Sequence, residues 1–282
     1  MLGYIRDLLT GAIPQVEPID AEDGLEQWIA ASFDRWSALI DPLPENVGPR
    51  FPNGYYNFAY EIVGPAKQIP LTQLAETVRA SVVRYTGWPP FWYPTRKGIK
   101  PYLADGTVEC WLGADPDTPV EARDTAHSDF WRIAPEGRAY LLRGYQEDSG
   151  DFPREGQRNL APGTVFDATL PIWRVGETFL QAERLAANLF EGHTTIRFAA
   201  EFTGLQGRSL VRMDGMRHFR DGRTARQASI RLQTHIESQA IGPNLPEIVH
   251  SFLAPLYALF DFFELPKQLV VGELNRMRTR KF

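Results

Sequence analysis

Residues 164–204 read TVFDATLPIWRVGETFLQAERLAANLFEGHTTIRFAAEFTG and contain the clearest structural signal in the chain. The pattern predicts a strand over 164–175 that runs towards a helix over 176–190, because apolar residues in the second part recur at intervals of three and four. Alternation of apolar and polar residues predicts the next strand over 194–204. This order indicates a unit in which a helix packs on a sheet.

Two more strands extend this unit. GRSLVRM (207–213) is predicted to pair with the strand over 194–204 through a short loop at 205–207. RQASIRLQTHIES (226–238) alternates strictly between apolar and polar residues and predicts a third strand.

The preceding segment has the same order of elements. YYNFAYEIVG (55–64) predicts a strand, and a helix follows over 70–85, since a proline suits the first helical turn. GTVECWLG (106–113) predicts a second strand, and DFWRIAPEGRAYLLRGYQED (129–148) predicts a β-hairpin that turns at Pro135-Glu136-Gly137. Both halves therefore predict a strand, a helix and three strands.

These patterns predict an α+β protein made of two similar strand–helix–three-strand units with antiparallel sheets, flanked by N-terminal and C-terminal helices. Apolar spacing and prolines predict flanking helices over 1–12, 24–40, 246–263 and 266–277. The expected division is N-terminal helices and a linker at 1–54, the first unit at 55–160, the second unit at 161–240 and C-terminal helices at 241–282. The two units are expected to pack as one domain, with a ligand cleft at their seam.

The composition indicates a cytoplasmic protein. One cysteine, Cys110, cannot form an intramolecular disulfide bond. The first residues lack the basic and apolar regions of a signal peptide. The most apolar stretch, Ile248 to Phe263, is interrupted by His250 and Pro255, so no membrane partner is expected. The formal net charge of −5 does not favour nucleic acid for the chain as a whole.

An aromatic segment, GWPPFWYPTR (87–96), is the most distinctive motif. Its large, rigid rings are typical of a cradle for a planar ligand, with Arg96 binding an anion. The alternative is a hydrophobic plug between a helix and the sheet. The candidate ligand-binding residues are Trp88, Trp92, Tyr93, Arg96, Trp111, Trp131 and Trp173.

A basic stretch, Arg208 to Arg231, suggests a hairpin that contacts phosphates. The alternative is a solvated loop whose charge is neutralised by acidic neighbours, including those of a partner subunit. The candidate residues for binding an anion or nucleic acid are Arg208, Arg212, Arg217, Arg220 and Arg223.

No motif of catalytic strength occurs, and His127 is the residue on which a hydrolase would centre. Asp124 or Asp129 would orient it as a general base. The alternative is a loop histidine that caps a turn. Glu109 and Glu201 interrupt apolar strands, and each either binds a cation inside the protein or faces water on the open side of an antiparallel sheet.

Metal and cofactor binding are not expected. The histidines are scattered without metal-ligand spacing, and no glycine-rich loop for a phosphate occurs.

The runs YTGWPPFWYPTR, GTVECWLG, DFWRIAPEGRAYLLRGYQED and GTVFDATLPIWRVGE resemble the C-terminal region of bacterial proteins that carry a Schlafen-AlbA-type DNA-binding domain at their N-terminus. The resemblance covers about residues 55–240. It implies that the chain is a piece of a longer protein and forms its sensing or assembly part. In element order alone, the chain is also similar to gyrase-inhibitor-like effector domains, in which two helix-and-sheet units flank a ligand cleft.

Three hypotheses for the function follow. The first is a non-catalytic binding, sensing or assembly module of a bacterial regulatory or defence-type protein, with a small-molecule ligand and a tendency to form homo-oligomers. The second is a regulatory protein that contacts nucleic acid or a protein partner through the basic hairpin. The third is a hydrolase. Tryptophans that converge on a concave surface favour the first, an exposed arginine face favours the second, and a pocketed His127 beside a carboxylate favours the third.

Overall fold

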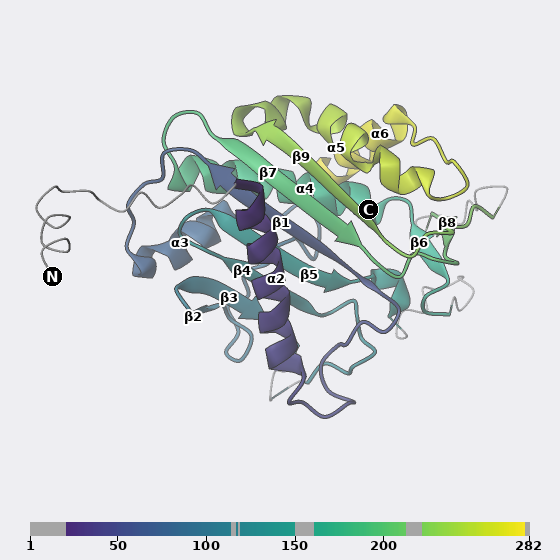
Figure 1. Ribbon diagram of the computed structural model, residues 1–282, viewed down its shortest axis with the longest axis horizontal. Helices are drawn as coiled ribbons and strands as arrows, with labels where there is room; N and C mark the ends of the chain where they lie inside the picture. Colours follow the sequence, from purple (N-terminus) through teal and green to yellow (C-terminus); the bar gives the residue numbers. More distant parts are fainter. Residues whose placement is uncertain (1–20, 114–116, 118, 150–160, 213–221, 280–282) are drawn as a thin grey trace, which may run out of the picture.

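One antiparallel sheet of seven strands forms the centre of the computed structural model, which describes residues 21–113, 117, 119–149, 161–212 and 222–279 (Figure 1). The order across the sheet is β2-β3-β4-β5-β1-β7-β9. Strand β1 lies between β5 of the first half and β7 of the second, so both halves build a single sheet. The strands are β1 (Tyr55–Val63), β2 (Tyr102–Ala104), β3 (Thr107–Trp111), β4 (Asp129–Ile133), β5 (Arg138–Gly144), β7 (Thr195–Phe202) and β9 (Ile230–Glu237).

Helices cover both faces of this sheet. Helix α2 crosses one face, and the other four helices of the described residues pack on the opposite face (Figure 1). Their bounds are α2 (Ala21–Ile40), α3 (Leu71–Ser81), α4 (Leu170–Leu189), α5 (Ile241–Ala258) and α6 (Lys267–Thr279). The α+β class, the antiparallel sheet and the flanking terminal helices are therefore confirmed.

Alternation along β1 distributes its side chains between two hydrophobic cores. Phe58, Tyr60 and Ile62 belong to the larger core, with α3, α4, α5 and α6. Ala59 belongs to the smaller core under α2. Because both faces are covered, β4 and β5 are buried along nearly their whole length.

The second half departs from the predicted pairing. Strand β8 (Ser209–Val211) does not pair with the strand before it, as predicted for 207–213. It pairs in parallel with β6 (Val165–Asp167), and the two form a small separate sheet. The turn glycines that separate β8 from β7 lead the chain away from the main sheet, and β9 takes the place beside β7.

Several element bounds also differ from the predicted ones. The strand expected over 164–175 ends at Asp167, because the Asp167 carboxylate accepts the backbone N–H groups of Thr169 and Leu170 and so starts α4 there. Helix α5 starts at Ile241, before the predicted 246. The helix predicted over 1–12 lies outside the described residues. No helix in the described ranges has the length and apolar character that a membrane crossing needs.

A close approach of two backbones joins the start of β1 to the end of β7. Gly54 and Gly204 both have positive φ angles, of 110° and 64°. A Cβ atom at Gly204 would lie 2.1 Å from the carbonyl oxygen of Asn53, so only glycine fits there. Gly207 also has a positive φ, of 82°, but has open space around its Cα.

Gly204 and Gly207 give a matched pair of substitutions. Gly207→Ala should lower the free energy of unfolding by about 1–2 kcal/mol, the strain of a left-handed backbone with a Cβ. Gly204→Ala should cost roughly 2 kcal/mol more, because the backbone at Asn53 must also move. Urea denaturation of both variants measures the difference, and equal losses would contradict the close approach.

Candidate functional site

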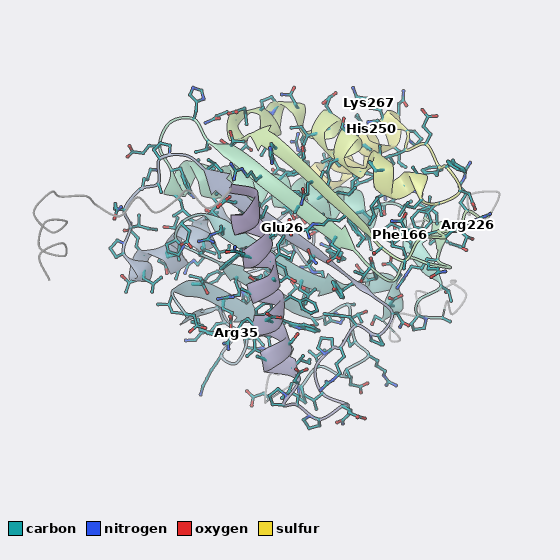
Figure 2. The ribbon with its side chains drawn as sticks, in the orientation of Figure 1. Glu26, Arg35, Phe166, Arg226, His250 and Lys267 are labelled. Atoms are coloured by element: carbon teal, nitrogen blue, oxygen red, sulfur yellow. The ribbon has the colours of Figure 1, made fainter. Side chains whose placement is uncertain are left out.

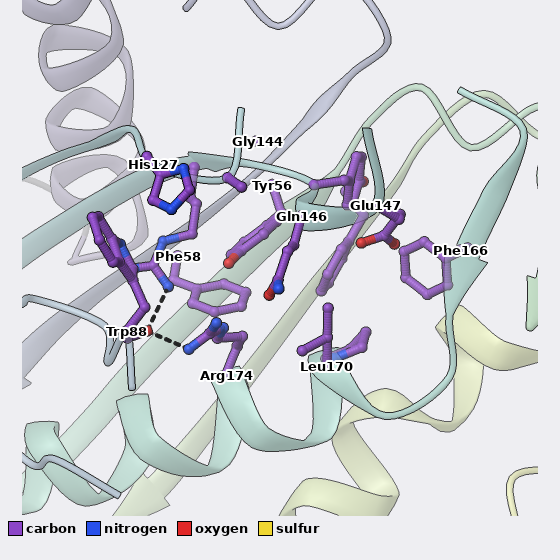
Figure 3. A pocket seen from close by; sticks show the side chains of 15 residues that line it. Tyr56, Phe58, Trp88, His127, Gly144, Gln146, Glu147, Phe166, Leu170 and Arg174 are labelled. Atoms are coloured by element: carbon purple, nitrogen blue, oxygen red, sulfur yellow. Dashed lines mark hydrogen bonds between the residues drawn. The ribbon is translucent and has the colours of Figure 1, made fainter. Parts of the chain in front are cut away.

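A cavity of about 100 Å³ lies where the start of β1 and the end of β5 meet the start of α4 (Figure 3). One part of its wall is aromatic and consists of Tyr56, Phe58, Tyr145, Phe166 and Phe202. The polar part of the wall comes from Trp88, His127, Arg143, Gln146, Glu147 and Arg174. Residues of both halves line the cavity. The ligand cleft between the two halves stays a prediction.

A buried ion pair supports one wall. The Asp129 carboxylate is fully buried and accepts two hydrogen bonds from Arg143, one of them 2.6 Å long from Nε. It also accepts one from the indole N–H of Trp88, at 3.1 Å. Burial alone would lower the pKa of Arg143, but the charge of Asp129 raises it above its ordinary value. Arg143 therefore stays cationic and holds Trp88 in place.

Helix α4 holds the residues that lead into the aromatic segment, 85–88, from the other side. These four residues are called the aromatic turn below. Glu177 is fully buried and accepts backbone N–H groups from Tyr85, at 2.8 Å, and Thr86, at 2.7 Å. Arg174 donates to the Thr86 hydroxyl, at 3.0 Å, and to the Trp88 carbonyl. The Trp88 carbonyl also accepts from Arg143, at 3.2 Å. The aromatic turn is thus positioned by buried charges of β5 and α4.

Arg174 still has donors directed to the cavity. Both of its hydrogen bonds come from Nη1, and within the described residues Nε and Nη2 have no hydrogen-bond partner. Figure 3 shows its guanidinium group pointing into the space that the Gln146 amide also faces. Burial and the neighbouring charge of Arg143 lower the pKa of Arg174. An anion or a carbonyl oxygen in the cavity would offset both effects.

Glu147 adds a group that changes charge near neutral pH. It follows β5, in the short 3₁₀ turn Gln146–Asp148, and accepts the backbone N–H of Asp167 at 3.0 Å. Burial, followed by the nearby charge of Asp167, raises the pKa of Glu147 to about 7.

His127 lies at the boundary between the cavity and a larger groove of about 600 Å³. Its Nδ1 atom is 3.0 Å from a carboxylate oxygen of Asp124, and its ring meets the edge of Trp88. The carboxylate beside His127 is therefore that of Asp124, since Asp129 is bound to Arg143. Neither the cavity nor the groove is lined by a Ser or Cys side chain of the described residues.

The predicted ligand-binding residues do not converge on one surface. Trp88, Trp92 and Arg96 line the groove, and Trp88 also reaches the cavity. Trp131 is fully buried, donates to the Trp92 carbonyl at 3.0 Å and packs near Tyr93. These two residues support the aromatic segment from within the core.

Trp111 and Trp173 lie away from both cavities. Trp111 and its register partner Phe130 point to the face of the sheet that α2 covers, and Trp111 packs in the smaller core there. The neighbouring pair, Cys110 and Trp131, points to the opposite face. Trp173 packs on the larger core, under Arg276 of α6.

Of the arginines predicted to form a basic surface, Arg208 is buried, and Arg212 and Arg223 are partly exposed and bonded within the chain. Arg208 is fully buried and binds the Asp148 carboxylate through two hydrogen bonds, of 2.8 and 2.5 Å. Arg212 pairs with Glu273 of α6 at 2.6 Å. Arg223 donates to the Asp261 carbonyl at 3.0 Å.

Arg217 and Arg220 lie outside the described residues. The three described arginines of the predicted set therefore hold the protein's own elements together, and Arg208 has no exposed surface.

The two strand carboxylates differ in their surroundings. Glu109 does not face water, because α2 covers that side of the sheet. It is fully buried and accepts hydrogen bonds from Arg35, at 3.0 Å, and from the Tyr102 hydroxyl, at 2.6 Å. Glu201 is partly buried and accepts from the Asn57 amide at 2.8 Å. In the described part of the chain, no group of three or more His, Cys, Asp or Glu residues could hold a metal ion.

The sequence analysis missed Arg143, Arg174, Glu147 and Glu177. For three of them the signal is a charge inside an apolar element, in RAYLLRG for Arg143 and IWRVGETF for Arg174 and Glu177. Glu147 lies in a polar turn and has no such signal. A charge that interrupts a buried element needs a buried partner, and such pairs concentrate at cavities.

Removing one partner of the Arg208–Asp148 pair should destabilise the fold. Arg208→Met leaves the Asp148 carboxylate buried without a counter-charge, and a loss of about 3–5 kcal/mol in the free energy of unfolding is expected. Arg226→Met is the matched control, because that side chain is 93% exposed, and its effect should stay within roughly 0.5 kcal/mol. Urea denaturation followed by tryptophan fluorescence measures both.

The raised pKa of Glu147 predicts a pH-dependent stability. The folded state favours the protonated form, so folding takes up a proton between pH 4.5, the ordinary value, and about 7. Stability should fall across this window by roughly 3 kcal/mol and level off above it. Glu147→Gln should remove this component, so the wild-type and variant curves should diverge from pH 5 to pH 8. Parallel curves from urea denaturation would contradict the assignment.

Comparison with known proteins assigns neither a family nor a function to this site. The resemblance to proteins with a Schlafen-AlbA-type domain stays a prediction, and function has to be argued from the site. No protein-family model, no curated protein and no solved structure matches this chain.

Proposed function

We propose that the chain is a binding or sensing module for a small anionic ligand with a flat apolar part, and that the ligand binds in the cavity at the start of α4. The observation that carries this proposal is Arg174. Its Nε and Nη2 donors have no hydrogen-bond partner within the described residues, and Arg174 lines a cavity whose wall is partly aromatic and partly polar. A guanidinium group whose free donors face a cavity is suited to a carboxylate or phosphate oxygen.

The aromatic wall supports the second part of the proposal. Rings of Tyr56, Phe58 and Phe202 pack against one another, with centroids 5.0 to 6.0 Å apart, and form one side of the cavity. An apolar cavity of about 150 Å³ can hold a benzene molecule. The cavity here is smaller, about 100 Å³, but it opens beside Trp88 and His127, which also line the neighbouring groove, so one ring or a compact acid would extend into this mouth.

The position of the cavity supports a sensing role. Its walls come from β1 and β5 of the first half and from α4 and β7 of the second. A ligand there would contact elements of both halves at once, so binding would stabilise their present arrangement by mass action.

Benzoate is a suitable probe, with benzylamine as its cationic counterpart. Isothermal titration calorimetry should detect benzoate binding with a Kd of roughly 1 mM, a typical affinity for a ligand of this size. Benzylamine should bind at least tenfold more weakly, because its ammonium group would face the charge of Arg174. Equal binding of the two compounds would overturn the proposed ligand class.

Two tryptophan variants locate the binding site. Leu170 is the first residue of α4 and lines the cavity, so Leu170→Trp should fill it and abolish benzoate binding. Leu71 is the first residue of α3 and is 37% exposed, so Leu71→Trp is the matched control and should bind as the wild type does. Unchanged binding by Leu170→Trp would place the site elsewhere.

A further inference from the structure

The two edges of the sheet differ in how they are protected. Strand β2 forms one edge with three residues, and β9 forms the other with eight. β9 pairs with β7 one residue to one from end to end, without a bulge. Its sequence, IRLQTHIE, contains no proline, glycine or lysine. Monomeric proteins usually block a long edge strand by one or more protective devices, and β9 has no bulge, no proline and no lysine; its two charged side chains are one Arg and one Glu.

The alternation of hydrogen bonds along β9 identifies the backbone N–H and C=O groups that point away from β7. The backbone N–H of Ser238 donates to the carbonyl of Thr194 at 2.9 Å, so residue 238 bonds towards β7. In an antiparallel ladder the bonding direction alternates, so 230, 232, 234 and 236 also bond towards β7. The backbone groups of Arg231, Gln233, His235 and Glu237 point the other way, where the described residues place no further strand.

A groove borders this edge of the sheet. This groove of about 530 Å³ follows β9, and α5 forms its far side with Asn244, Ile248 and Ser251. Figure 1 shows α5 running beside β9 at the border of the sheet. Leu232 and Ile236 point to the α5 side, and the four outward residues have exposed side chains on the α2 side or at the rim.

We propose that this edge binds the β9 strand of a second copy of the chain, antiparallel about a two-fold axis at Thr234. In this register, Arg231 of each copy lies opposite Glu237 of the other. Leu232 lies opposite Ile236, and Gln233 opposite His235. Every outward N–H and C=O group of these strands then finds a partner, and the two sheets continue as one.

Charge complementarity selects both the occupant and the register. Directly opposite residues of antiparallel strands interact, and opposite charges at such positions are favourable. Moving the axis to Gln233 or His235 separates Arg231 from Glu237. An axis between two residues would place outward groups opposite inward ones. Glu26 of α2, which Figure 2 labels, already contacts Arg231 and Gln233 and so keeps Arg231 on the α2 side of the sheet.

Charge reversal tests the pairing in the full chain. Sedimentation velocity at micromolar concentration should give a wild-type dimer with twice the chain mass of 32.0 kDa. Arg231→Glu and Glu237→Arg, each alone, should weaken the dimer at least tenfold, because each creates two like-charged pairs. An equimolar mixture of these variants should form a dimer again, since both facing pairs of the mixed dimer then combine one acidic with one basic side chain.

Arg226→Glu is the matched control, because Arg226 is 93% exposed and lies before β9, and this variant should remain a dimer. Circular dichroism should show that all variants are folded. A wild-type chain that is monomeric at these concentrations would overturn the proposal. So would a dimer that both reversals leave intact, or a variant mixture that stays monomeric.

Discussion

The Trp88 carbonyl accepts hydrogen bonds from two buried arginines, and the candidate site depends on this interaction. Arg143 comes from the sheet and Arg174 from α4. Each arginine has a fully buried carboxylate beside it, Asp129 for the first and Glu177 for the second. Two like charges brought so close are tolerated only because these carboxylates compensate them. The arrangement keeps α4, the aromatic turn and the sheet at fixed distances, and the cavity is the space that remains between them.

Much of the fold could be predicted from the sequence, because long periodic segments have few alternatives. The strands around Phe58 and Phe198 and the helix around Phe179 alternate or repeat so regularly that only one assignment fits. The pairing of β8 could not be predicted, since a strand of three residues carries no register of its own and follows its surroundings. The burial of Glu109 depended on α2 covering the second face, which no local pattern around Glu109 reveals.

The candidate site was predicted in part. Trp88, Trp92 and Arg96 come from one continuous segment, and a rigid segment brings its own residues to one place. Trp111 and Trp173 were grouped with them by residue type alone, and strand alternation and helix rotation carried them to other surfaces. The stretch from Arg208 to Arg231 was predicted to be a basic surface because few acidic residues lie near it in the sequence. The partners of Arg208 and Arg212 are separated from them by 60 and 61 residues, at Asp148 and Glu273.

The central position of β1 has a consequence for how the chain reaches this structure. Tyr56 pairs with Arg143 of β5 on one side and with Phe202 of β7 on the other. The middle of the sheet can therefore form only after nearly three quarters of the chain has been synthesised. Contacts this distant in sequence make folding slow, because long loops must close before the contacts form. Until β7 arrives, β1 presents an open apolar edge on the ribosome, and this part of the nascent chain is where a chaperone would be needed most.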